Sequence, residues 1–400
     1  KLGVEKDDMV RITVRGKTVD AAVYVQPGMA SDTVVLALGY GRKQVGYIGQ
    51  GAGFNAYALR HGEALGYDEA TLSKVGSKYT DPRDEWFGDA VKITGLVSTQ
   101  DHFSLEGRPL VREASLTRFR HHPEFAKHAV HHKPLIALWD DPPELKEGQQ
   151  WGMTIDLSAC TGCGTCTVAC QAENNIPIVG KAQVRKGREM HWIRIDRYFS
   201  FGKTALGHHD LNDNNTEVTH QPVGCQHCEH APCENVCPVA ATMHSSDGIN
   251  DMVYNRCVGT RYCLNNCPWK VRRFNFLDFR RDMEFSPFAG ETPEVAKLRF
   301  NPDVTLRSRG VIEKCTYCVQ RIRGAQRDAQ LKTGSRNLAD GSVVTACQQA
   351  CPSQAIAFGD INDKNSRVAH EKASPRSYEM LAELNARPRT SYLARIRNPN

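Results

Sequence analysis

The chain has 400 residues, and its 40% hydrophobic content is enough to give each of two or three domains a core. Its 51 Lys and Arg residues exceed its 45 Asp and Glu residues by only 6, so charge alone does not support nucleic-acid or membrane-surface binding. No apolar run approaches the roughly 20 residues that a membrane-spanning helix needs, so we do not expect the chain to cross a bilayer. The first residues, KLGVEKDD, contain neither Met nor an apolar signal, and we expect the natural start to lie upstream.

The N-terminal part is predicted to be rich in β-structure. Residues 9–25, MVRITVRGKTVDAAVYV, alternate apolar and polar side chains around a central RGK, which is typical of a β-hairpin with one buried face. Glycines then punctuate a run of short apolar pieces, which predicts tight turns interleaved with short strands. These glycines are Gly39, Gly41, Gly46, Gly49, Gly51 and Gly53. A phosphate-binding loop is the weaker interpretation, because GQGAGF does not stand between a clear strand and helix and no Walker lysine follows.

Residues 117–148 form a polar, proline-containing connector that includes HHPEFAKHAVHHKP. Its histidines could bind a metal, but a solvated linker is the preferred interpretation, because no periodic scaffold would hold them in place. We therefore place a domain boundary near residue 145. It divides the chain into an N-terminal part, residues 1–145, and a C-terminal part, residues 146–400.

The fifteen cysteines are the most informative feature of the sequence, and all of them lie between residues 160 and 351. An odd number in a chain of this length argues against a disulfide framework. The first of four groups, CTGCGTCTVAC, has the C-x2-C-x2-C-x3-C spacing of bacterial ferredoxins, with Gly162 and Gly164 in its loop. No C-x-x-C-H occurs, so covalent c-type haem attachment to this chain is excluded.

The other three groups vary the same pattern. Group two, CQHCEHAPCENVCP, has a wider middle gap, and group four is split into CTYC and CQQACP by a long insertion. Group three, CVGTRYCLNNCP, has Thr260 where the second cysteine belongs. Since each group of a two-cluster ferredoxin lends its last cysteine to the partner cluster, we expect the outer groups to pair with each other and the inner groups to pair with each other.

This pairing predicts four sets of ligands. Sets I, II and III have four cysteines each and are predicted to hold 4Fe-4S clusters, whereas set IV has three and is predicted to hold a 3Fe-4S cluster. Set I is Cys160, Cys163, Cys166 and Cys351; set II is Cys170, Cys315, Cys318 and Cys347; set III is Cys225, Cys228, Cys233 and Cys267; set IV is Cys237, Cys257 and Cys263. All fifteen cysteines are used, which a decayed third group would not predict.

Two alternatives bear on these sets. In set IV, an oxygen or water ligand to a fourth iron is the alternative to a 3Fe-4S cluster. Zinc is the main alternative for the whole array, because C-x2-C pairs also form zinc ribbons, but closely spaced runs and repeated Cys-Pro do not suit one tetrahedral ion. We interpret His227 and His230, beside group two, as hydrogen-bond donors that tune a cluster rather than as ligands.

Four clusters without candidate acids, bases or nucleophiles around them predict an electron relay, with no substrate-converting site on this chain. A 3Fe-4S centre generally has the higher potential, so its end of the relay suits exchange with a quinone. The run WKVRRFNFLDF, residues 269–279, follows group three. Its pattern is consistent with a docking surface for a membrane partner or with a half-buried strand that has charged edges.

The four groups, Thr260, NPDVTLRSRGVIEKCTYCVQRI and the terminal ELNARPRTSYLARIRNPN together resemble the iron–sulfur subunits of the complex iron–sulfur molybdoenzyme family. The resemblance covers nearly the whole chain and is closest to the iron–sulfur, molybdopterin-oxidoreductase-like subunit of bacterial alternative complex III. It implies an α+β fold: a four-cluster, double-ferredoxin-like domain preceded by a small β-rich, barrel-like terminal piece of a molybdopterin-oxidoreductase-like domain. VQPGMASDTVVLALGYGR and GQGAGFNAY resemble the end of such a domain.

The same resemblance implies partners and location. The molybdenum cofactor would be absent, an integral-membrane protein would oxidise quinol near the 3Fe-4S cluster, and electrons would leave through c-type haem subunits to cytochrome c or another periplasmic acceptor. The chain would lie on the periplasmic side of the bacterial inner membrane, within a hetero-oligomeric respiratory complex. The main alternative is the electron-transfer portion of a molybdopterin reductase of the polysulfide or tetrathionate type. A non-redox assembly scaffold with structural metal is the third hypothesis.

Overall fold

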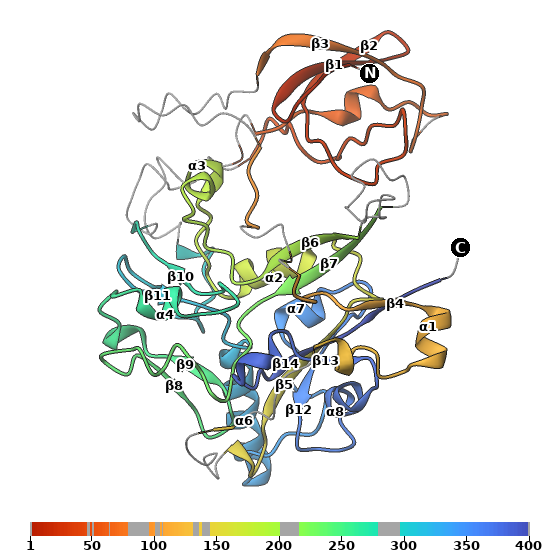
Figure 1. Ribbon diagram of the computed structural model, residues 1–400. Helices are drawn as coiled ribbons and strands as arrows, with labels where there is room; N and C mark the ends of the chain where they lie inside the picture. The colour runs from red at the N-terminus through yellow and green to blue at the C-terminus, as the bar shows by residue number, and fades with distance from the viewer. Residues whose placement is uncertain are drawn as a thin grey trace.

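The computed structural model describes most of the chain, including all fifteen cysteines. Figure 1 shows a small sheet near the N-terminus and a larger part built from short helices and strands. This mixed α and β content agrees with the predicted fold class. The described residues are 2–45, 49, 52–63, 65–78, 96–100, 105, 107–130, 136–137, 145–200, 216–278 and 297–398.

The N-terminal sheet has the order β2-β1-β3 and contains the predicted hairpin. Its strands are β1 (Asp8–Val14), β2 (Lys17–Ala22) and β3 (Thr71–Lys78). Val14 pairs with Lys17 across a two-residue turn at Arg15 and Gly16, and both turn residues have positive φ, as tight hairpins require. One face is buried with the 3-10 helix η2 (Ala56–Leu59). The buried apolar residues are Val10, Ile12, Val14, Ala21 and Leu59.

Two expectations about this part are wrong. The sheet is open, and no further strand of the described residues closes it into a barrel. The apolar run 33–40 forms no strand, and Val35 and Leu38 are 73% and 44% exposed, because no strand in the described part of the chain pairs with it.

The turn interpretation is confirmed at Gly41 and Gly53, which have positive φ; a Cβ at Gly41 would collide with the backbone of Asn55. Gly46 and Gly51 lie outside the described residues.

A four-stranded sheet of order β12-β5-β14-β13 forms the centre of the C-terminal part. Its strands are β5 (Trp151–Asp156), β12 (Ile356–Asp360), β13 (Ser377–Tyr378) and β14 (Thr390–Leu393). β5 is antiparallel to β12 and parallel to β14, so residues from both ends of this part meet in one sheet. The ring of Trp151 stacks on that of Phe358, with centroids 5.4 Å apart, in the large core that also contains most of the cysteines.

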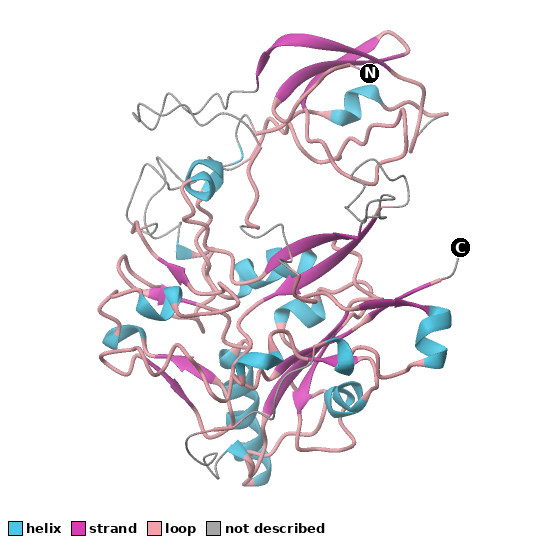
Figure 2. Cartoon of the chain, viewed as in Figure 1, coloured by secondary structure: helices cyan, strands magenta, loops and turns pink. Residues whose placement is uncertain are grey.

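Short elements and loops surround this sheet, as Figure 2 shows. The helices are α2 (Thr165–Glu173), α3 (Gly180–Arg185), η6 (Tyr254–Arg256), α4 (Tyr262–Asn265), α6 (Val319–Thr333), α7 (Ala346–Gln349), α8 (Arg367–Ala373) and η7 (Ala382–Leu384). Three antiparallel pairs complete it: β6 (Arg194–Ser200) with β7 (Glu217–Val223), β8 (Thr242–His244) with β9 (Asn250–Met252), and β10 (Arg273–Phe274) with β11 (Ile312–Glu313). None of the helices in the described ranges is long and apolar enough to span a bilayer.

The connector packs against the C-terminal part. Its strand β4 (Glu113–Ser115) pairs in parallel with β15 (Arg395–Arg397), and the following helix is α1 (Leu116–His121), with a 3-10 turn η4 (Lys127–Ala129) beyond it. Phe125 and Ala126 belong to the larger core. The boundary near residue 145 stays a prediction. His131 and His132 lie outside the described residues, and no described histidine of the connector joins a group that could hold a metal.

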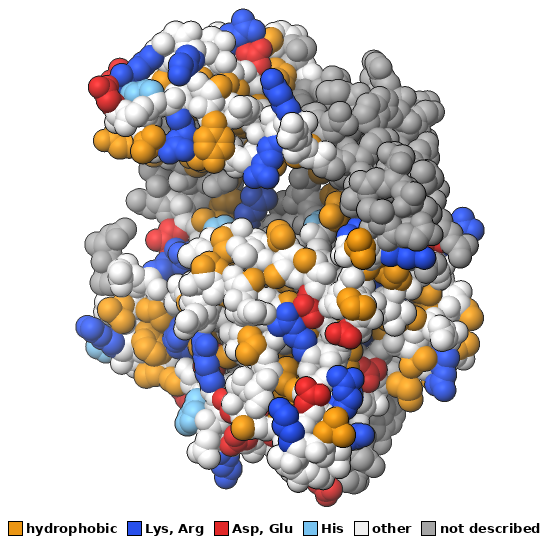
Figure 3. Space-filling view, turned by 180° about the vertical axis from the view of Figure 1, so that it is seen from behind, with side chains coloured by type: hydrophobic (Ala, Val, Ile, Leu, Met, Phe, Trp, Pro, Cys, Tyr) orange, Lys and Arg blue, Asp and Glu red, His pale blue; other side chains and the backbone are white. Residues whose placement is uncertain are grey.

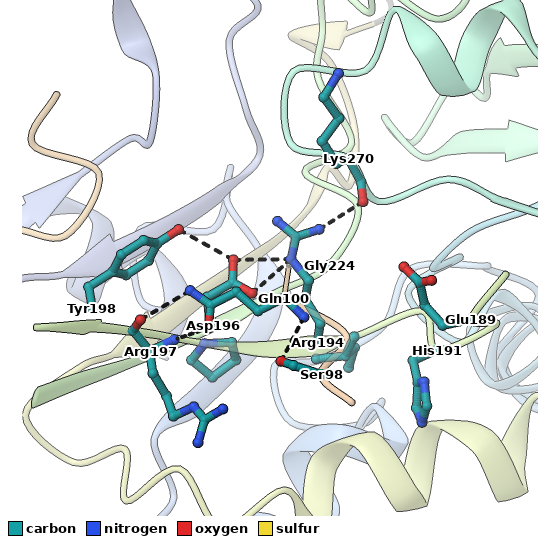
Figure 4. A network of polar contacts seen from close by, with 12 residues as sticks. Ser98, Gln100, Glu189, His191, Arg194, Asp196, Arg197, Tyr198, Gly224 and Lys270 are labelled. Carbon is teal, nitrogen blue, oxygen red and sulfur yellow. Dashed lines mark hydrogen bonds and ion pairs between the residues drawn. The ribbon is translucent and has the colours of Figure 1, made fainter. Parts of the chain in front are cut away.

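The segment before the connector contacts β6 through a polar network (Figure 4). The side-chain amide of Gln100 donates to the carbonyl oxygen of Arg197 and accepts from its N–H, both at 3.0 Å, so this side chain pairs with β6 as a strand would. Arg194 forms a buried ion pair with Asp196 and donates to the carbonyl of Lys270 at 2.7 Å. The network thus links β6 to the chain that follows Cys267.

Charged side chains of both signs are mixed on the face shown in Figure 3, without a large area of one sign. This distribution agrees with the small net charge of the sequence, +6. It gives that face no electrostatic preference for nucleic acid.

Candidate iron–sulfur site

All four cysteine groups begin with the same loop conformation. The third residue of each C-x-x-C, or of C-x-x-T in group three, has a positive φ: 71° at Gly162, 46° at His227, 72° at Gly259 and 53° at Tyr317. A left-handed residue at this point tightens the turn, and glycine adopts it without steric cost. Thr260 therefore occupies in group three the place that the second cysteine occupies in the others.

The three Cys-Pro sequences share a second local structure. In each, the third residue after the cysteine has a positive φ, and the N–H of the fourth donates to the cysteine sulfur. The cysteines are Cys237, Cys267 and Cys351; the third residues are Ala240, Lys270 and Gln354; the fourth residues are Ala241, Val271 and Ala355. Backbone N–H groups directed at sulfur stabilise a thiolate and raise the potential of a cluster that it holds.

The structure brings the members of set I together. The loop between β5 and α2 carries Cys160 and Cys163, the first turn of α2 carries Cys166, and Cys351 follows α7. The thiol of Cys160 is near enough to those of Cys351 and Cys163 for their charges to interact, and the same holds for Cys166 and Cys160. Cys163 is exposed, so this set lies at the surface.

Set II lies deeper, and its members also come together. Cys170, near the end of α2, interacts electrostatically with Cys315, Cys318 and Cys347. The side-chain amide of the buried Asn174 lies 3.6 Å from the sulfur of Cys170 and 3.9 Å from that of Cys318. The last cysteine of group one therefore joins the cysteines of group four, as the outer pairing predicts.

Set III is a compact, buried group. The Cys228 thiol interacts electrostatically with those of Cys225, Cys267 and Cys233, and all four cysteines are buried. They line one internal hollow together with Trp269 and other residues of the same loops. The cysteine that completes this set comes from group three, as the inner pairing predicts.

Set IV brings the three remaining cysteines together. Cys263, in α4, interacts electrostatically with Cys257 and Cys237. The three thiols line a small hollow whose wall also includes Thr260. Thr260 is exposed, so the side of the hollow without a cysteine faces the surface.

Neighbouring sets lie close enough for their charges to interact, and these interactions define an order. Cys347 of set II interacts with Cys166 of set I, and Cys315 of set II interacts with Cys225 of set III. Sets III and IV are joined through one side chain, Arg272, which is near the sulfurs of both Cys233 and Cys263. The order is therefore I, II, III, IV, with exposed residues at both ends and buried thiols between.

Burial alters the protonation of these thiols. Desolvation, followed by the charges of neighbouring cysteines, raises the pKa of Cys166 to about 11, of Cys347 to about 12 and of Cys170 well above its ordinary value. The exposed Cys163 has a lowered pKa, because Thr165 donates a hydrogen bond to its sulfur. Iron binding must therefore displace protons from most of these thiols, which makes cluster loading dependent on pH.

The donor atoms suit iron–sulfur clusters better than zinc. All fifteen cysteines are free thiols, and they gather in groups of four, four, four and three. Across the described ranges, no three His, Cys, Asp or Glu side chains lie close enough together to hold a single metal ion. The closely spaced cysteine runs that carry these groups suit a cluster, whose thiolates bind separate iron atoms, better than one tetrahedral zinc ion.

The two histidines of group two have different environments. His230 contacts the carbonyl oxygen of Asn385 through Nδ1, at 3.1 Å. His227 is fully buried, its Nδ1 accepts from the N–H of Asn250, and its ring stacks on that of Tyr317 with centroids 3.8 Å apart. Since His227 and Tyr317 are equivalent residues of groups two and four, the stack lies between sets II and III. The proposed role of either histidine in tuning a cluster stays a prediction.

The run after group three is largely buried. Trp269, Val271, Arg272 and Arg273 are at most 8% exposed, and only Arg273 and Phe274 form a strand, β10. Arg273 pairs with Glu189 at 2.5 Å, while Lys270 is exposed. The half-buried strand is thus the nearer interpretation, although the strand is much shorter than the run. Phe279 lies outside the described residues.

Sequence reasoning missed the inward direction of Arg272. The residue stands among Lys270 and Arg273, so its pattern indicated a basic surface, whereas its guanidinium contacts cysteine sulfur. It also missed Lys314, which is fully buried beside Cys315 and donates to its carbonyl oxygen at 2.9 Å, and Asn174, described with set II. Each of the three stands beside a charged or polar residue, so the local sequence gave no signal that it would be buried.

Comparison with known proteins places this site in a family. Residues 159–241 and residues 216–279 each match a family described as a 4Fe-4S dicluster domain. The chain is 38% identical over 248 residues to the menaquinone reductase iron–sulfur cluster-binding subunit of Nitratidesulfovibrio vulgaris, which covers 62% of this chain and 89% of that protein. It belongs to the family of iron–sulfur subunits of molybdoenzyme-type oxidoreductases.

Two further members extend the family to archaea. The Hdr-like menaquinol oxidoreductase iron–sulfur subunit 1 of Archaeoglobus fulgidus is 31% identical over 270 residues, covering 63% of this chain and 86% of that protein. The putative dimethyl sulfoxide reductase iron–sulfur protein of Halobacterium salinarum is 33% identical over 246 residues, covering 61% and 78%. Members of this family are electron-transfer subunits of oxidoreductase complexes whose catalytic site lies on another chain. This confirms the predicted electron-transfer function and the iron–sulfur cofactor.

Proposed function

We propose that the chain is the electron relay of a membrane-associated respiratory complex that oxidises quinol. Sets I, II and III would hold 4Fe-4S clusters and set IV a 3Fe-4S cluster. The electrostatic coupling of neighbouring sets, from I through II and III to IV, is the observation that carries this proposal. When bound, such clusters accept and release single electrons. A row whose middle is buried and whose ends approach the surface suits passage between two partners.

A 3Fe-4S cluster in set IV is supported by the geometry of Thr260. Its loop repeats the left-handed turn of the other groups, so the side chain at this position is the one that would otherwise supply a fourth thiolate. A threonine hydroxyl is a much weaker ligand for iron than a thiolate, which leaves three ligands. The oxygen-ligated alternative requires the hydroxyl, or a water beside it, to hold a fourth iron.

The quinol side of the relay is proposed at set IV. A groove beside Thr260 is lined by basic side chains and by two aromatic rings. The lining includes Arg188, Arg261, Lys270, Phe274 and Phe276. Arg188 lies over the ring of Phe276 at 4.6 Å, and Arg261 lies over that of Phe274 at 4.8 Å. We propose that an integral-membrane quinol-binding subunit docks here; two of the relatives carry menaquinone or menaquinol in their names.

We further propose that the complex is a bacterial alternative complex III and that this chain is its iron–sulfur subunit. Residues 146–400 would be the relay domain. Residues 1–145 would be the end of a molybdopterin-oxidoreductase-like domain without molybdenum. Electrons would leave set I for c-type haem subunits, and the chain would lie on the periplasmic side of the inner membrane. The support is the sequence resemblance together with the β-rich character of residues 8–78.

The alternative function is the electron-transfer portion of a molybdopterin reductase. It is favoured by relatives named as subunits of tetrathionate reductase, from Salmonella typhimurium, and of selenate reductase, from Mesobacillus selenatarsenatis. In that case the same relay would carry electrons from quinol towards an active molybdenum or tungsten centre. The four ligand sets would be the same in both cases. The two functions are therefore distinguished by whether the complex contains molybdenum or tungsten.

Metal analysis and EPR of the complex purified with its natural partners test both the cluster assignment and the proposed identity of the complex. Oxidised protein should show a spin-half 3Fe signal that disappears on mild reduction, and three further clusters should become paramagnetic as the potential is lowered. Four reducible cubanes without an oxidised-state signal would overturn the assignment of set IV. Molybdenum and tungsten near zero per chain support the alternative complex III assignment, whereas one metal per chain makes the reductase the correct function.

A further inference from the structure

Arg272 lies in the interior between sets III and IV. Its side chain is 2% exposed. Its nitrogen Nη2 is 3.0 Å from the sulfur of Cys233, a member of set III. The guanidinium also lies near enough to the sulfur of Cys263, a member of set IV, for their charges to interact. One side chain therefore interacts with both sets.

Neutral partners hold the guanidinium in this position. Nη2 donates to the hydroxyl of Thr242 at 2.6 Å and to the side-chain oxygen of Asn250 at 3.0 Å. These residues belong to the hairpin β8–β9 and are themselves almost fully buried. The amide nitrogen of Asn250 in turn donates to the carboxylate of Glu234. The nearest carboxylate of this network is therefore linked to Arg272 through the side chain of Asn250. The guanidinium is thus fixed against the sulfur of Cys233, with that of Cys263 nearby.

A buried guanidinium needs a negative charge nearby, because removing an isolated ion from water costs several kcal/mol. Within the described ranges no carboxylate forms an ion pair with Arg272, and the groups that act on its charge most strongly are cysteines. They are Cys233, Cys263, Cys225 and Cys267. These groups are negative as thiolates, the form that binds iron. The counter-charge of Arg272 is therefore supplied by the loaded sets.

Other buried arginines of the same domain have carboxylate partners. Arg273, the next residue, pairs with Glu189, and Arg307 pairs with Glu313 at 2.9 Å. The charge of each is neutralised within its own pair. Arg272 is different, because its positive charge is directed at two cluster sites.

We propose that Arg272 is a positioning residue of the relay whose fixed positive charge raises the reduction potentials of the clusters in sets III and IV together. The inference rests on the proposed function. A cluster becomes more negative by one charge when it accepts an electron, so a cation beside its ligands favours the reduced form. The effect is strong in a buried, weakly screened site and declines with distance, so sets I and II should feel it much less.

Raising both potentials together has a consequence for the relay. The difference between the two potentials changes less than either potential does, so the driving force of the step from set IV to set III is little affected. Both centres become easier to reduce by the donor at the set IV end. One arginine would thereby raise the reduction potentials of both sets III and IV, the half of the relay that receives electrons from the donor.

Redox titration followed by EPR, on the intact complex carrying Arg272→Gln, tests this inference. The signals of sets III and IV should shift to more negative potentials, while those of sets I and II keep their wild-type midpoints. Arg272→Lys retains the charge, but one ammonium group cannot reach both sulfurs, so at least one of the two potentials should fall. Arg327→Gln is the matched control: it removes a 73% exposed arginine side chain of α6, and no midpoint should move.

Unchanged potentials at sets III and IV in Arg272→Gln would overturn the inference, and so would an equal shift of all four centres. If the Arg272→Gln variant does not retain the two clusters, the Arg272→Lys variant becomes the test. Wild-type potentials at both set III and set IV in Arg272→Lys would also overturn the inference. A wild-type complex without four clusters would instead refute the proposed function, before any variant is made. The two failures are therefore distinguishable.

Discussion

The N-terminal sheet and the cluster domain are stabilised in different ways. The sheet has strands of six to eight residues and a core of aliphatic side chains such as Val10 and Ile12. The cluster domain has many strands of two to four residues, and it buries thiols together with charged groups such as Arg272 and Lys314. The first region can hold its shape by apolar burial alone, whereas the second encloses polar groups that are satisfied when metal is bound.

The largest expected effect comes from removing iron from the full chain. Without clusters, Arg272 loses its counter-charge and the loops that carry the cysteines lose the bonds that join them, so the cluster domain should lose most of its ordered structure. Strands β1, β2 and β3 should persist. Hydrogen exchange, measured before and after chelation under reducing conditions, should show lost protection across the cluster domain, including β5, β12 and β14, and unchanged protection in the N-terminal sheet. An equal loss of protection in the N-terminal sheet would show that this sheet also depends on bound metal.

Replacing one inner ligand should give the next largest effect. Cys267 is the buried cysteine that group three contributes to set III, and we propose it as a ligand. Cys267→Ser should remove the iron of the set III cluster and the EPR signal of that cluster, because the serine oxygen is a poor ligand in place of the thiolate. The signals of sets I and II should survive. A variant that retains all its iron would show that Cys267 is not a ligand.

A substitution at Thr260 should change one centre and leave the fold intact. Thr260→Cys supplies a thiolate at the place of the missing ligand, so the oxidised-state 3Fe signal should vanish and the iron content should rise. Thr260→Ser is the control, since it keeps the hydroxyl and should keep the 3Fe signal. Iron analysis with EPR measures both variants. An unchanged 3Fe signal in the cysteine variant would mean that residue 260 does not face the cluster.

The smallest effect on the relay is expected from a substitution in the N-terminal sheet. Ile12 is 3% exposed in the core of that sheet. Ile12→Ala should destabilise the sheet by about 2–5 kcal/mol through lost burial and a residual cavity, while iron content and EPR signals stay unchanged. Lys17→Ala, at an exposed strand position, is the control for the substitution itself. Loss of iron in Ile12→Ala would mean that the two regions fold as one unit.

Local features were predictable from the sequence, and features that depend on distant residues were not. The hairpin at residues 8–22 follows from alternation and from a two-residue turn, both of which are local. The run at residues 33–40 has strand-like composition, yet a strand also needs a neighbour, and its sequence does not contain that information. The barrel-like closure was an implication of the family resemblance, and the strands of the described residues form an open sheet instead.

The cysteine array shows the same division. Spacing and the rule that each group lends its last cysteine were enough to predict which thiols meet, because the rule concerns whole groups and not side-chain directions. The direction of Arg272 could not be predicted. It depends on the hairpin β8–β9, whose Thr242 and Asn250 hold the guanidinium. The αL residues Gly162 and Gly259 were readable as glycines, whereas the equivalent His227 and Tyr317 gave no such signal.

The exchange of cysteines between groups also bears on biosynthesis. As the chain leaves the ribosome, set IV has all its ligands once Cys263 has been made, and set III once Cys267 follows. Set II has to wait for Cys347 and set I for Cys351. The ligands of the relay are therefore completed in the reverse of their numbering, from the proposed quinol end to the exposed set I. The proposed ligands of both inner-pair clusters are thus complete before the long insertion of group four has been translated.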